Sequence, residues 1–272
     1  MTHCTSMIRM GLFMLTGLLC QPSLAGEAGK ATSSSSSAHL TAGMRYVAAP
    51  YQAGAKFRTP EGLEHALAED VAQGLGVALT PRSVDDTKAM TLLSTREVRM
   101  IVTEIRESDP RLREKHIVPT PYSAGPMAIM RTDTTIKTWD QLKGRTVCLS
   151  EGSPYKGMTA KRYGAIEQIY PAPADSLLAL RIGKCDAAVH DSTFLEQLLQ
   201  LPEWKKFSAR LPVGERSVLA FVTHRNDTEL AAQLTRINHQ WKNTGHLAKL
   251  NEKRVKHVAF EVYLDQNVPD CH

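Results

Sequence analysis

The chain has 272 residues, of which 42% are hydrophobic and 22% charged, a composition typical of one large or two medium globular domains. Its formal net charge of +5 comes from dispersed basic residues without an aromatic-interleaved patch, which argues against nucleic-acid binding. The sequence contains no Walker loop, dinucleotide fingerprint, His-Glu-x-x-His or Cys-x-x-Cys motif, and its histidines are scattered. We therefore expect neither a cofactor nor a metal site.

The N-terminus has the pattern of a cleaved secretory signal peptide. Arg9 precedes a short apolar run from Met10 to Leu19, and Ser23-Leu24-Ala25 gives a small-x-small cleavage pattern. The run is too short to span a bilayer comfortably. We predict a signal peptide over 1–25, a flexible serine-rich lead-in over 26–40, and export to the periplasm.

The first half of the mature chain alternates predicted strands and helices. Thr59 is a suitable helix cap and Pro60 a suitable first helical residue, and apolar side chains recur every four residues from Leu63 to Leu75. We predict strands over 44–49, 77–80 and 98–103, and helices over 59–75 and 85–95.

Polar side chains follow two of these strands, at the edge of the sheet where α/β proteins bind ligands. Tyr51 lies in the loop after the first strand, where stacking on a ligand and ordinary loop packing are both consistent with the sequence. The third strand runs into Glu104, Arg106 and then Arg111. This density of charge is consistent with a polar ligand site and equally with a solvated loop.

The second half continues the alternation. We predict strands over 127–130, 146–149, 166–170, 185–190, 207–213 and 217–223. Helices are expected over 154–163 and 174–182, from 191 to 199, and from 226 until Gly245 interrupts, with a last short helix over 246–253. Residues 258–264 are interpreted as an added strand or a docked extension.

The stretch from Trp139 to Tyr155 combines a strand, a glycine turn and a helix start. Ser153 is a good N-cap and Pro154 suits the first helical position, so backbone N–H groups and a positive helix end would point at one place. This arrangement predicts an anion-sized docking site, although an ordinary turn between a strand and a helix has the same pattern.

Several short motifs, in order, resemble bacterial periplasmic solute-binding proteins of the polar amino-acid type. The resemblance covers about Met44 to Val255 and lies in Gly62-Leu63-Glu64 with the helix after it, Pro121-Tyr122, Asp140-Gln141-Leu142-Lys143-Gly144, Gly152-Ser153, Gly183 to Val189, and Asp191-Ser192. It implies an α/β, two-lobed periplasmic-binding fold, each lobe a mostly parallel sheet flanked by helices, joined by two hinge strands. The first lobe would comprise 41–125 plus 218–272 and the second 126–217.

The resemblance also assigns ligand contacts. Asp191 matches the position that commonly accepts the ligand amino group, and Ser153 matches a secondary anion contact. Leu112 stands where the family carries an arginine for the ligand carboxylate, and Arg111 is adjacent to it. Glu104 replaces a usual glycine and would repel a carboxylate, so Glu104 and Asp191 together favour a ligand with cationic groups. The expected ligand-binding residues are Tyr51, Glu104, Arg106, Arg111, Ser153, Tyr155 and Asp191.

Two cysteines of the mature chain support the strand arrangement that the resemblance implies for the second lobe. Cys148 and Cys185 begin strands that the family places side by side, and export places them in an oxidising compartment, so we expect a disulfide, with two buried free thiols as the alternative. Cys271 is then the odd cysteine, either a free thiol in the tail or one that pairs between molecules.

The function implied is the solute-binding component of a transport system. A monomer would capture a small polar, amino-acid-like or amine-containing ligand by hinge closure and deliver it to an inner-membrane permease, without catalysis. Two alternatives stay open. One is a ligand-less accessory protein of a periplasmic quinoprotein dehydrogenase, and the other is a cleft enzyme of the cyclohexadienyl dehydratase kind.

Overall fold

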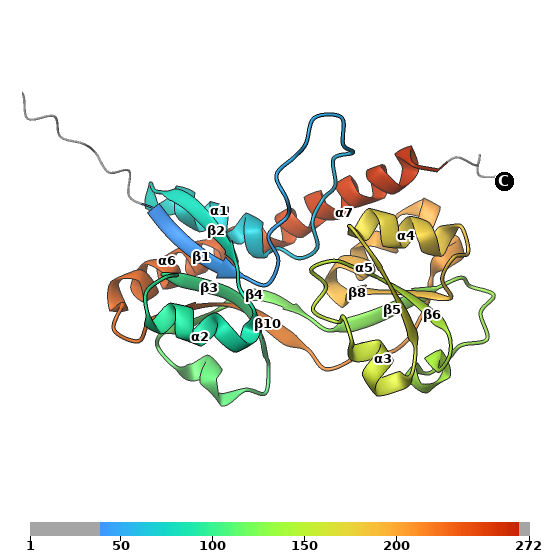
Figure 1. Ribbon diagram of the computed structural model, residues 1–272, viewed down its shortest axis with the longest axis horizontal. Coiled ribbons are helices and arrows are strands. Elements are labelled where there is room, and N and C mark those ends of the chain that lie inside the picture. Colours follow the sequence, from blue (N-terminus) through green and yellow to red (C-terminus); the bar gives the residue numbers. More distant parts are fainter. Residues whose placement is uncertain (1–38, 267–272) are drawn as a thin grey trace, which may run out of the picture. The chain divides into compact units, whose positions relative to one another are not determined.

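The computed structural model describes residues 39–266, and these form two five-stranded sheets with helices packed around each (Figure 1). The described residues belong to one contact unit. The predicted signal peptide, nearly all of the predicted lead-in and Cys271 lie outside the described residues.

The first sheet has the strand order β2-β1-β3-β10-β4. Its strands are β1 (His39–Met44), β2 (Ala78–Ser83), β3 (Met100–Arg106), β4 (Ile117–Ala124) and β10 (Ser217–Thr223). The accompanying helices are α1 (Glu64–Leu75), α2 (Asp86–Ser94) and α6 (Thr228–Thr244), with a short 3-10 helix, η1 (Pro110–Arg113). Leu67 and Val71 of α1, whose recurrence predicted this helix, are fully buried in the core beside the sheet.

The second sheet has the order β7-β6-β8-β5-β9. Its strands are β5 (Pro126–Met130), β6 (Thr146–Ser150), β7 (Ile166–Tyr170), β8 (Ala187–Asp191) and β9 (Ala209–Arg210). Around it lie α3 (Met158–Tyr163), α4 (Pro173–Arg181), α5 (Ser192–Leu198) and two 3-10 helices, η2 (Trp139–Leu142) and η3 (Pro202–Phe207).

Each sheet is mostly parallel, as predicted, with one strand that runs against the other four. In the first sheet β1 pairs in parallel with β2 and β3, while β10 is antiparallel to β3 and β4. The second sheet repeats this arrangement with β6 parallel to β7 and β8, and β5 antiparallel to β8 and β9. The reversed strands, β5 and β10, are the ones that follow the two passages of the chain between the sheets.

The chain passes between the sheets at two adjacent places, from β4 to β5 and from β9 to β10. A Cβ atom at Gly125 would lie 2.8 Å from the carbonyl oxygen of Gly214, so a glycine is required where the two passages touch. The N–H of Gly214 donates to the carbonyl of Pro126 at 2.9 Å, which ties the passages to each other. These are the two predicted hinge strands.

Helix α7 (His246–Leu264) is shared by the two hydrophobic cores. Its first turn places Leu247 in the core of the first sheet, whereas Val255, Val258 and Val262 pack in a core of the second sheet (Figure 1). The prediction of a helix ending at 253 and a strand or extension over 258–264 is therefore wrong. The lobe boundaries stay a prediction, and they have to accommodate a helix that packs on both sheets.

Three further local predictions are wrong. The first strand lies at 39–44 rather than 44–49. Helix α1 begins at Glu64 and not at the Thr59-Pro60 pair. Helix α3 begins at Met158 after Gly157, so Ser153 does not cap it. In addition, only Ala209–Arg210 of the strand predicted over 207–213 pairs with the sheet.

Candidate functional site

Asp191 lies where the two sheets meet, and its carboxylate joins them. It ends β8 and is only 3% exposed. Its Oδ2 accepts a hydrogen bond from the Tyr122 hydroxyl at 2.8 Å, and its Oδ1 accepts one from the Tyr155 hydroxyl at 2.7 Å. Tyr122 belongs to β4 of the first sheet and Tyr155 to the turn after β6 of the second. One buried carboxylate therefore holds donors from both sheets.

A bulge in β4 brings Tyr122 to this position. Val218 of β10 pairs with Ser123, but Ala220 already pairs with Pro119, so Leu219 alone lies opposite three residues of β4. Such a bulge leaves side chains re-aimed and backbone groups unpaired, and the N–H of Tyr122 donates instead to the Thr120 hydroxyl at 3.2 Å. The prolines of this segment favour the irregularity because they have no N–H to give to the ladder.

Asp191 interacts electrostatically with carboxyl groups of β3, of α1 and of the segment before α1. Burial, the largest influence, and the charge of Glu61 raise the pKa of Asp191 despite its tyrosine donors. Burial and the charges of Asp191 and Glu64 raise the pKa of Glu104 on β3 well above its usual range. Burial and the charge of Asp191 likewise raise the pKa of Glu64, on the first turn of α1, to about 7. The site thus has an excess of acidic groups, which is relieved by protons or by a cation.

Glu61 differs from the other acids of the site because its pKa is lowered, and its hydrogen-bond and ion-pair partners explain this. Its carboxylate accepts from Arg254 Nη2 at 2.8 Å and contacts His190 Nδ1 at 2.8 Å, and the Ser150 hydroxyl also donates to it. Burial alone would raise the pKa of Glu61, but His190, Arg254 and Ser150 outweigh burial and lower it to about 2. Glu61 comes from the segment before α1, whereas His190 and Ser150 come from β8 and β6, so this network also joins the two sheets.

The network continues to Ser176, which gives the arrangement carboxylate, histidine and serine. Ser176 Oγ lies 2.7 Å from His190 Nε2, but the same hydroxyl donates to the carbonyl of Pro173 at 3.0 Å. The hydroxyl has one proton, and the carbonyl of Pro173 competes with the imidazole for it. Ser176 and His190 are both 0% exposed. This geometry is a structural support for Glu61 and not a nucleophile with its base.

The structure brings some of the predicted ligand residues together. Tyr155 contacts Asp191 directly, and Glu104 is close enough for the charge of Asp191 to raise its pKa. Ser153 is 3% exposed and its hydroxyl accepts from the N–H of Tyr155 at 3.3 Å, so it supports Tyr155.

The other predicted ligand residues lie apart from Asp191. Tyr51 is 66% exposed in its loop. Arg106 is exposed and 3.9 Å from Glu215, and Arg111 is exposed and pairs with Asp109 at 2.6 Å. Arg111 does line, together with Glu104, a small cavity of about 280 Å³ beside β3. Ligand contact by the seven residues stays a prediction.

Five residues of this site were missed or assigned no role by the sequence reasoning: Glu61, Glu64, Tyr122, His190 and Arg254. Glu64 and Tyr122 stand in motifs that carried the family resemblance, and that was the signal that could have found them. Arg254 had no signal because the last helix was expected to end one residue before it.

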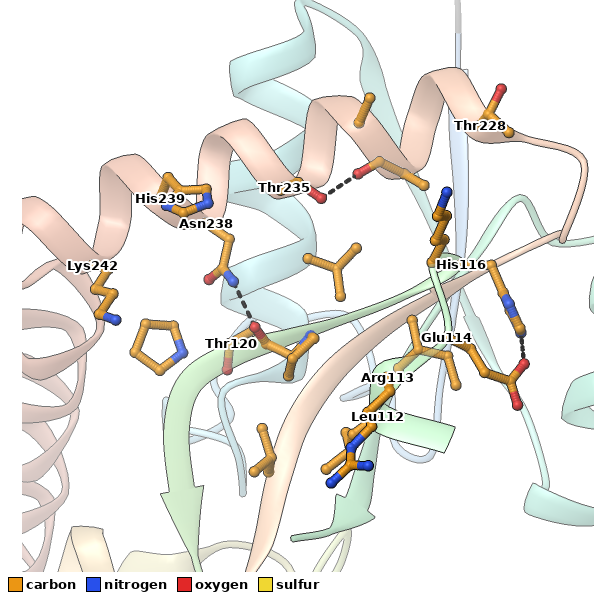
Figure 2. Close-up of a pocket in the computed structure, with 18 of the residues that line it drawn as sticks. Leu112, Arg113, Glu114, His116, Thr120, Thr228, Thr235, Asn238, His239 and Lys242 are labelled. Atoms are coloured by element: carbon orange, nitrogen blue, oxygen red, sulfur yellow. Dashed lines mark hydrogen bonds and ion pairs between the residues drawn. The ribbon is translucent and has the colours of Figure 1, made fainter. Parts of the chain in front are cut away.

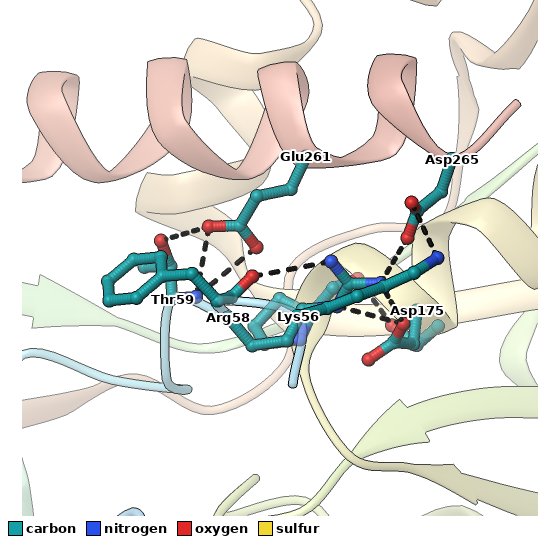
Figure 3. Close-up of polar contacts among 9 residues, drawn as sticks. Lys56, Arg58, Thr59, Asp175, Glu261 and Asp265 are labelled. Carbon is teal, nitrogen blue, oxygen red and sulfur yellow. Dashed lines mark hydrogen bonds and ion pairs between the residues drawn. The ribbon is translucent and has the colours of Figure 1, made fainter. Parts of the chain in front are cut away.

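Ion pairs and hydrogen bonds hold the segment between β1 and α1 to helices α4 and α7 (Figure 3). Arg58 pairs with Asp175 of α4 at 2.8 Å and also with Asp265 at the end of α7. The hydroxyl and N–H of Thr59 donate to Glu261 of α7 at 2.6 and 3.0 Å. These long-range contacts, rather than a helix start, occupy the residue predicted to cap α1.

A larger groove, of about 850 Å³, lies between β4 and α6 (Figure 2). Its lining includes Thr235, Asn238 and His239 of α6 on one side and Thr120 and Leu112 on the other (Figure 2). The Asn238 amide donates to the carbonyl of Pro119 at 2.5 Å, which joins the two walls. None of the predicted ligand residues lines this groove.

The predicted disulfide between Cys148 and Cys185 is confirmed. Their Cα atoms are 5.8 Å apart, and the bond links β6 to the turn before β8 inside the second core. Within residues 39–266, no group of three or more His, Cys, Asp or Glu side chains is placed to hold a metal ion. No helix in this part of the chain is long and apolar enough to cross a membrane.

Comparison with known proteins identifies the family. The model of bacterial extracellular solute-binding proteins, family 3, matches residues 40–257. The chain belongs to this family. The chain is similar to the arginine-binding extracellular protein ArtP of Bacillus subtilis, with 23% identity over 71% of the chain and 76% of ArtP.

Two further relatives agree with this assignment. The L-cystine-binding protein TcyJ of Escherichia coli is 26% identical over 48% of the chain, and the match spans half of TcyJ. A solved structure of AbpA from Streptococcus pneumoniae, an amino acid ABC transporter substrate-binding protein bound to L-arginine, superposes with a TM-score of 0.55. It is 18% identical and covers 81% of the chain and 95% of AbpA, so this likeness shows the two-lobed fold alone.

Proposed function

We propose that this family 3 protein binds a small solute with a cationic group between its two sheets and delivers it to an inner-membrane permease from the periplasm. The main support for this proposal is Asp191, a buried carboxylate that accepts hydrogen bonds from tyrosines of both sheets. Two further acidic groups, Glu104 and Glu64, interact electrostatically with it. The relatives named above bind amino acids, and this supports an amino-acid-like solute.

The chemistry of the site explains how a cation would be held. A carboxylate has about four lone-pair positions, so Asp191 can accept from both tyrosine hydroxyls and from a ligand ammonium or guanidinium. Burial, and after it the repulsion from neighbouring carboxylates, raises the pKa values of Glu104 and Glu64. A ligand cation takes the place of their protons, and the attraction is strong because little water screens it.

Closure follows from the position of the acids. Glu104 belongs to the first sheet and Asp191 to the second, so a cation that contacts both is bound fully only when the sheets are together. The ligand therefore stabilises the closed arrangement by its differential affinity for it. No step of this process needs bond breaking, and the proposal is that the chain is a binding protein and not an enzyme.

The test is isothermal titration calorimetry with L-arginine, L-lysine, L-cystine and putrescine, with L-glutamate as the negative comparison. Asp191→Asn should weaken binding of the cationic ligand by about 100-fold, since it removes a buried charge-assisted hydrogen bond. Asp140→Asn, an exposed aspartate on η2, is the matched control and should leave the affinity unchanged. Binding that survives Asp191→Asn, or no cationic compound binding at all, would contradict the proposal.

A further inference from the structure

The groove between β4 and α6 is a large cavity that belongs to no site assigned so far. Its volume of about 850 Å³ is within the range of ligand-binding clefts. Much of its lining is apolar and includes Leu112 of η1, Pro119 and Pro121 of β4, and Val218 of β10. Asp191 and its tyrosine partners do not line it. The groove therefore offers apolar surface for a second ligand, away from the solute site.

The charged side chains around the groove are nearly all basic. They are Arg113, Lys115, Arg225 and Lys242, and Glu114 is the only acid among the described residues that line it. Glu114 already pairs with Arg225 at 3.0 Å. Arg113, Lys115 and Lys242 form no ion pair with any of residues 39–266. The groove thus has an excess of positive charge, which an anionic occupant would neutralise.

The cations are spread along the groove and are not gathered at one end. Arg225 lies just before α6, and Lys242 is in the last turn of that helix. Thr228 and Lys242 both line the groove, so it extends along about 21 Å of α6 at a rise of 1.5 Å per residue. An extended peptide spans this length with about six residues, and it can carry acidic side chains at both ends and apolar ones between them. A fatty-acid anion has its single charge at one end and matches the pattern less well.

The sheet edge at this groove does not favour the addition of a further strand. β4 is an edge strand of the first sheet. Pro119 and Pro121 have no N–H to donate, and the carbonyl of Pro119 already accepts from the Asn238 amide at 2.5 Å. A strand from a second copy of this chain would therefore find the hydrogen-bond ladder interrupted here. An occupant of the groove has to be held by its side chains, through apolar contact and charge.

We propose that the groove binds an extended acidic segment of a partner protein, with carboxylates against Arg113, Lys115 and Lys242 and apolar side chains on the lining between them. This is a second binding site, and it does not rest on the proposed solute-binding function. The chain's own segment over 26–38 carries one acid and one base, so it does not supply the complementary charge. The three cations are exposed, so each contributes modestly and the affinity depends on several pairs and on the salt concentration.

The test is fluorescence anisotropy with two labelled peptides, titrated into the full mature chain at low ionic strength. The first peptide has about eight residues, with glutamates at both ends and leucines in the middle, and the second has lysines in place of the glutamates. The acidic peptide should bind with a Kd on the order of 10–100 μM, and its affinity should fall as salt is added. The lysine peptide should not bind, because the groove repels it.

The double variant Arg113→Glu, Lys242→Glu reverses two cations of the groove. It should weaken binding of the acidic peptide by about tenfold or more, since each attraction becomes a repulsion. Arg236→Glu, Lys249→Glu is the matched control, because it changes the net charge equally at exposed positions of α6 and α7 that do not line the groove. The control variant should keep the wild-type affinity, and the melting temperature of both variants checks that they are folded.

Three outcomes would overturn the proposal. If the wild-type protein does not bind the acidic peptide, or binds both peptides equally well, charge complementarity at the groove is excluded. If the two double variants weaken binding by the same factor, the peptide responds to the net charge of the protein and not to this groove. If dodecanoate binds more tightly than the peptide and loses affinity in the Arg113→Glu, Lys242→Glu variant, the groove belongs to a fatty-acid anion and not to a peptide.

Discussion

Glu61→Gln is the substitution that most directly tests how the two sheets are held together. The carboxylate of Glu61 receives Arg254, His190 and Ser150 in a place where it is 7% exposed. Glutamine has nearly the same shape but carries no charge, and its amide nitrogen would face donors on every side. The change leaves the buried guanidinium of Arg254 without the negative charge that it pairs with among residues 39–266.

Two separate arguments give the same magnitude for the loss of stability that Glu61→Gln should cause. Removal of one partner of a buried ion pair costs about 3–5 kcal/mol of unfolding free energy. Independently, the pKa of Glu61 falls from 4.5 to about 2 in the folded protein, and at about 1.4 kcal/mol per unit this corresponds to about 3 kcal/mol. A loss of this size is a large fraction of the roughly 5–15 kcal/mol that stabilises a typical domain.

The pH dependence gives the sharper test. Because the folded pKa is lowered, the contribution of Glu61 is present above pH 4.5 and is lost as the pH falls towards about 2. Urea denaturation should therefore show wild-type protein more stable than Glu61→Gln by about 3 kcal/mol near neutral pH, with a difference that shrinks below pH 4.5. Asp109→Asn, which breaks the exposed pair with Arg111, is the control and should have little effect. A difference under about 1 kcal/mol at neutral pH would refute the reasoning.

Two further predictions concern other parts of the molecule. The pKa of Glu64 is raised from 4.5 to about 7, so the stability of the wild-type protein should fall as the pH rises through this window. Glu64→Gln should be as stable as wild type near pH 5 and more stable by about 1–3 kcal/mol near pH 8, as followed by melting temperature. A constant difference in stability across this range would contradict the assigned pKa. The Cys148–Cys185 bridge spans 37 residues and should contribute about 2–4 kcal/mol to the free energy of unfolding. Reduced wild-type protein and the Cys148→Ala, Cys185→Ala double variant should unfold at similar urea concentrations, both lower than that of the oxidised protein. Equal urea midpoints for all three proteins would contradict a formed bridge.

Local sequence patterns predicted most of the fold because hydrophobic spacing is a local property. The strand over 217–223 lies where the pattern placed it, and α1 and α6 follow their apolar stripes. The errors arise where distant contacts decide the conformation. Thr59 looks like a helix cap, but its donors go to Glu261, which is 202 residues away. Residues 258–264 look extended, but packing against the second core makes them helical.

The same reason limits what could be predicted of the site. Asp191 and Tyr155 were found because they stand in or next to motifs that resemble a known family. Glu61 and Arg254 are 193 residues apart, and no pattern in either segment indicates that they form a pair. An arginine in the middle of an amphipathic helix is usually solvated, and only the three-dimensional packing of α7 shows that Arg254 is buried.

In the proposed function, binding and closure are one equilibrium, because the groups proposed to hold the solute are also the groups that join the sheets. Asp191 connects Tyr122 of the first sheet with Tyr155 of the second, and Glu61 connects Arg254 with His190. When the sheets come together they bury several acids at once, and the raised pKa values of Glu104 and Asp191 express the cost. A cationic group removes that cost without a proton. The affinity for a cation should therefore rise as the pH rises through the range in which these acids lose their protons, and binding should release protons to the buffer.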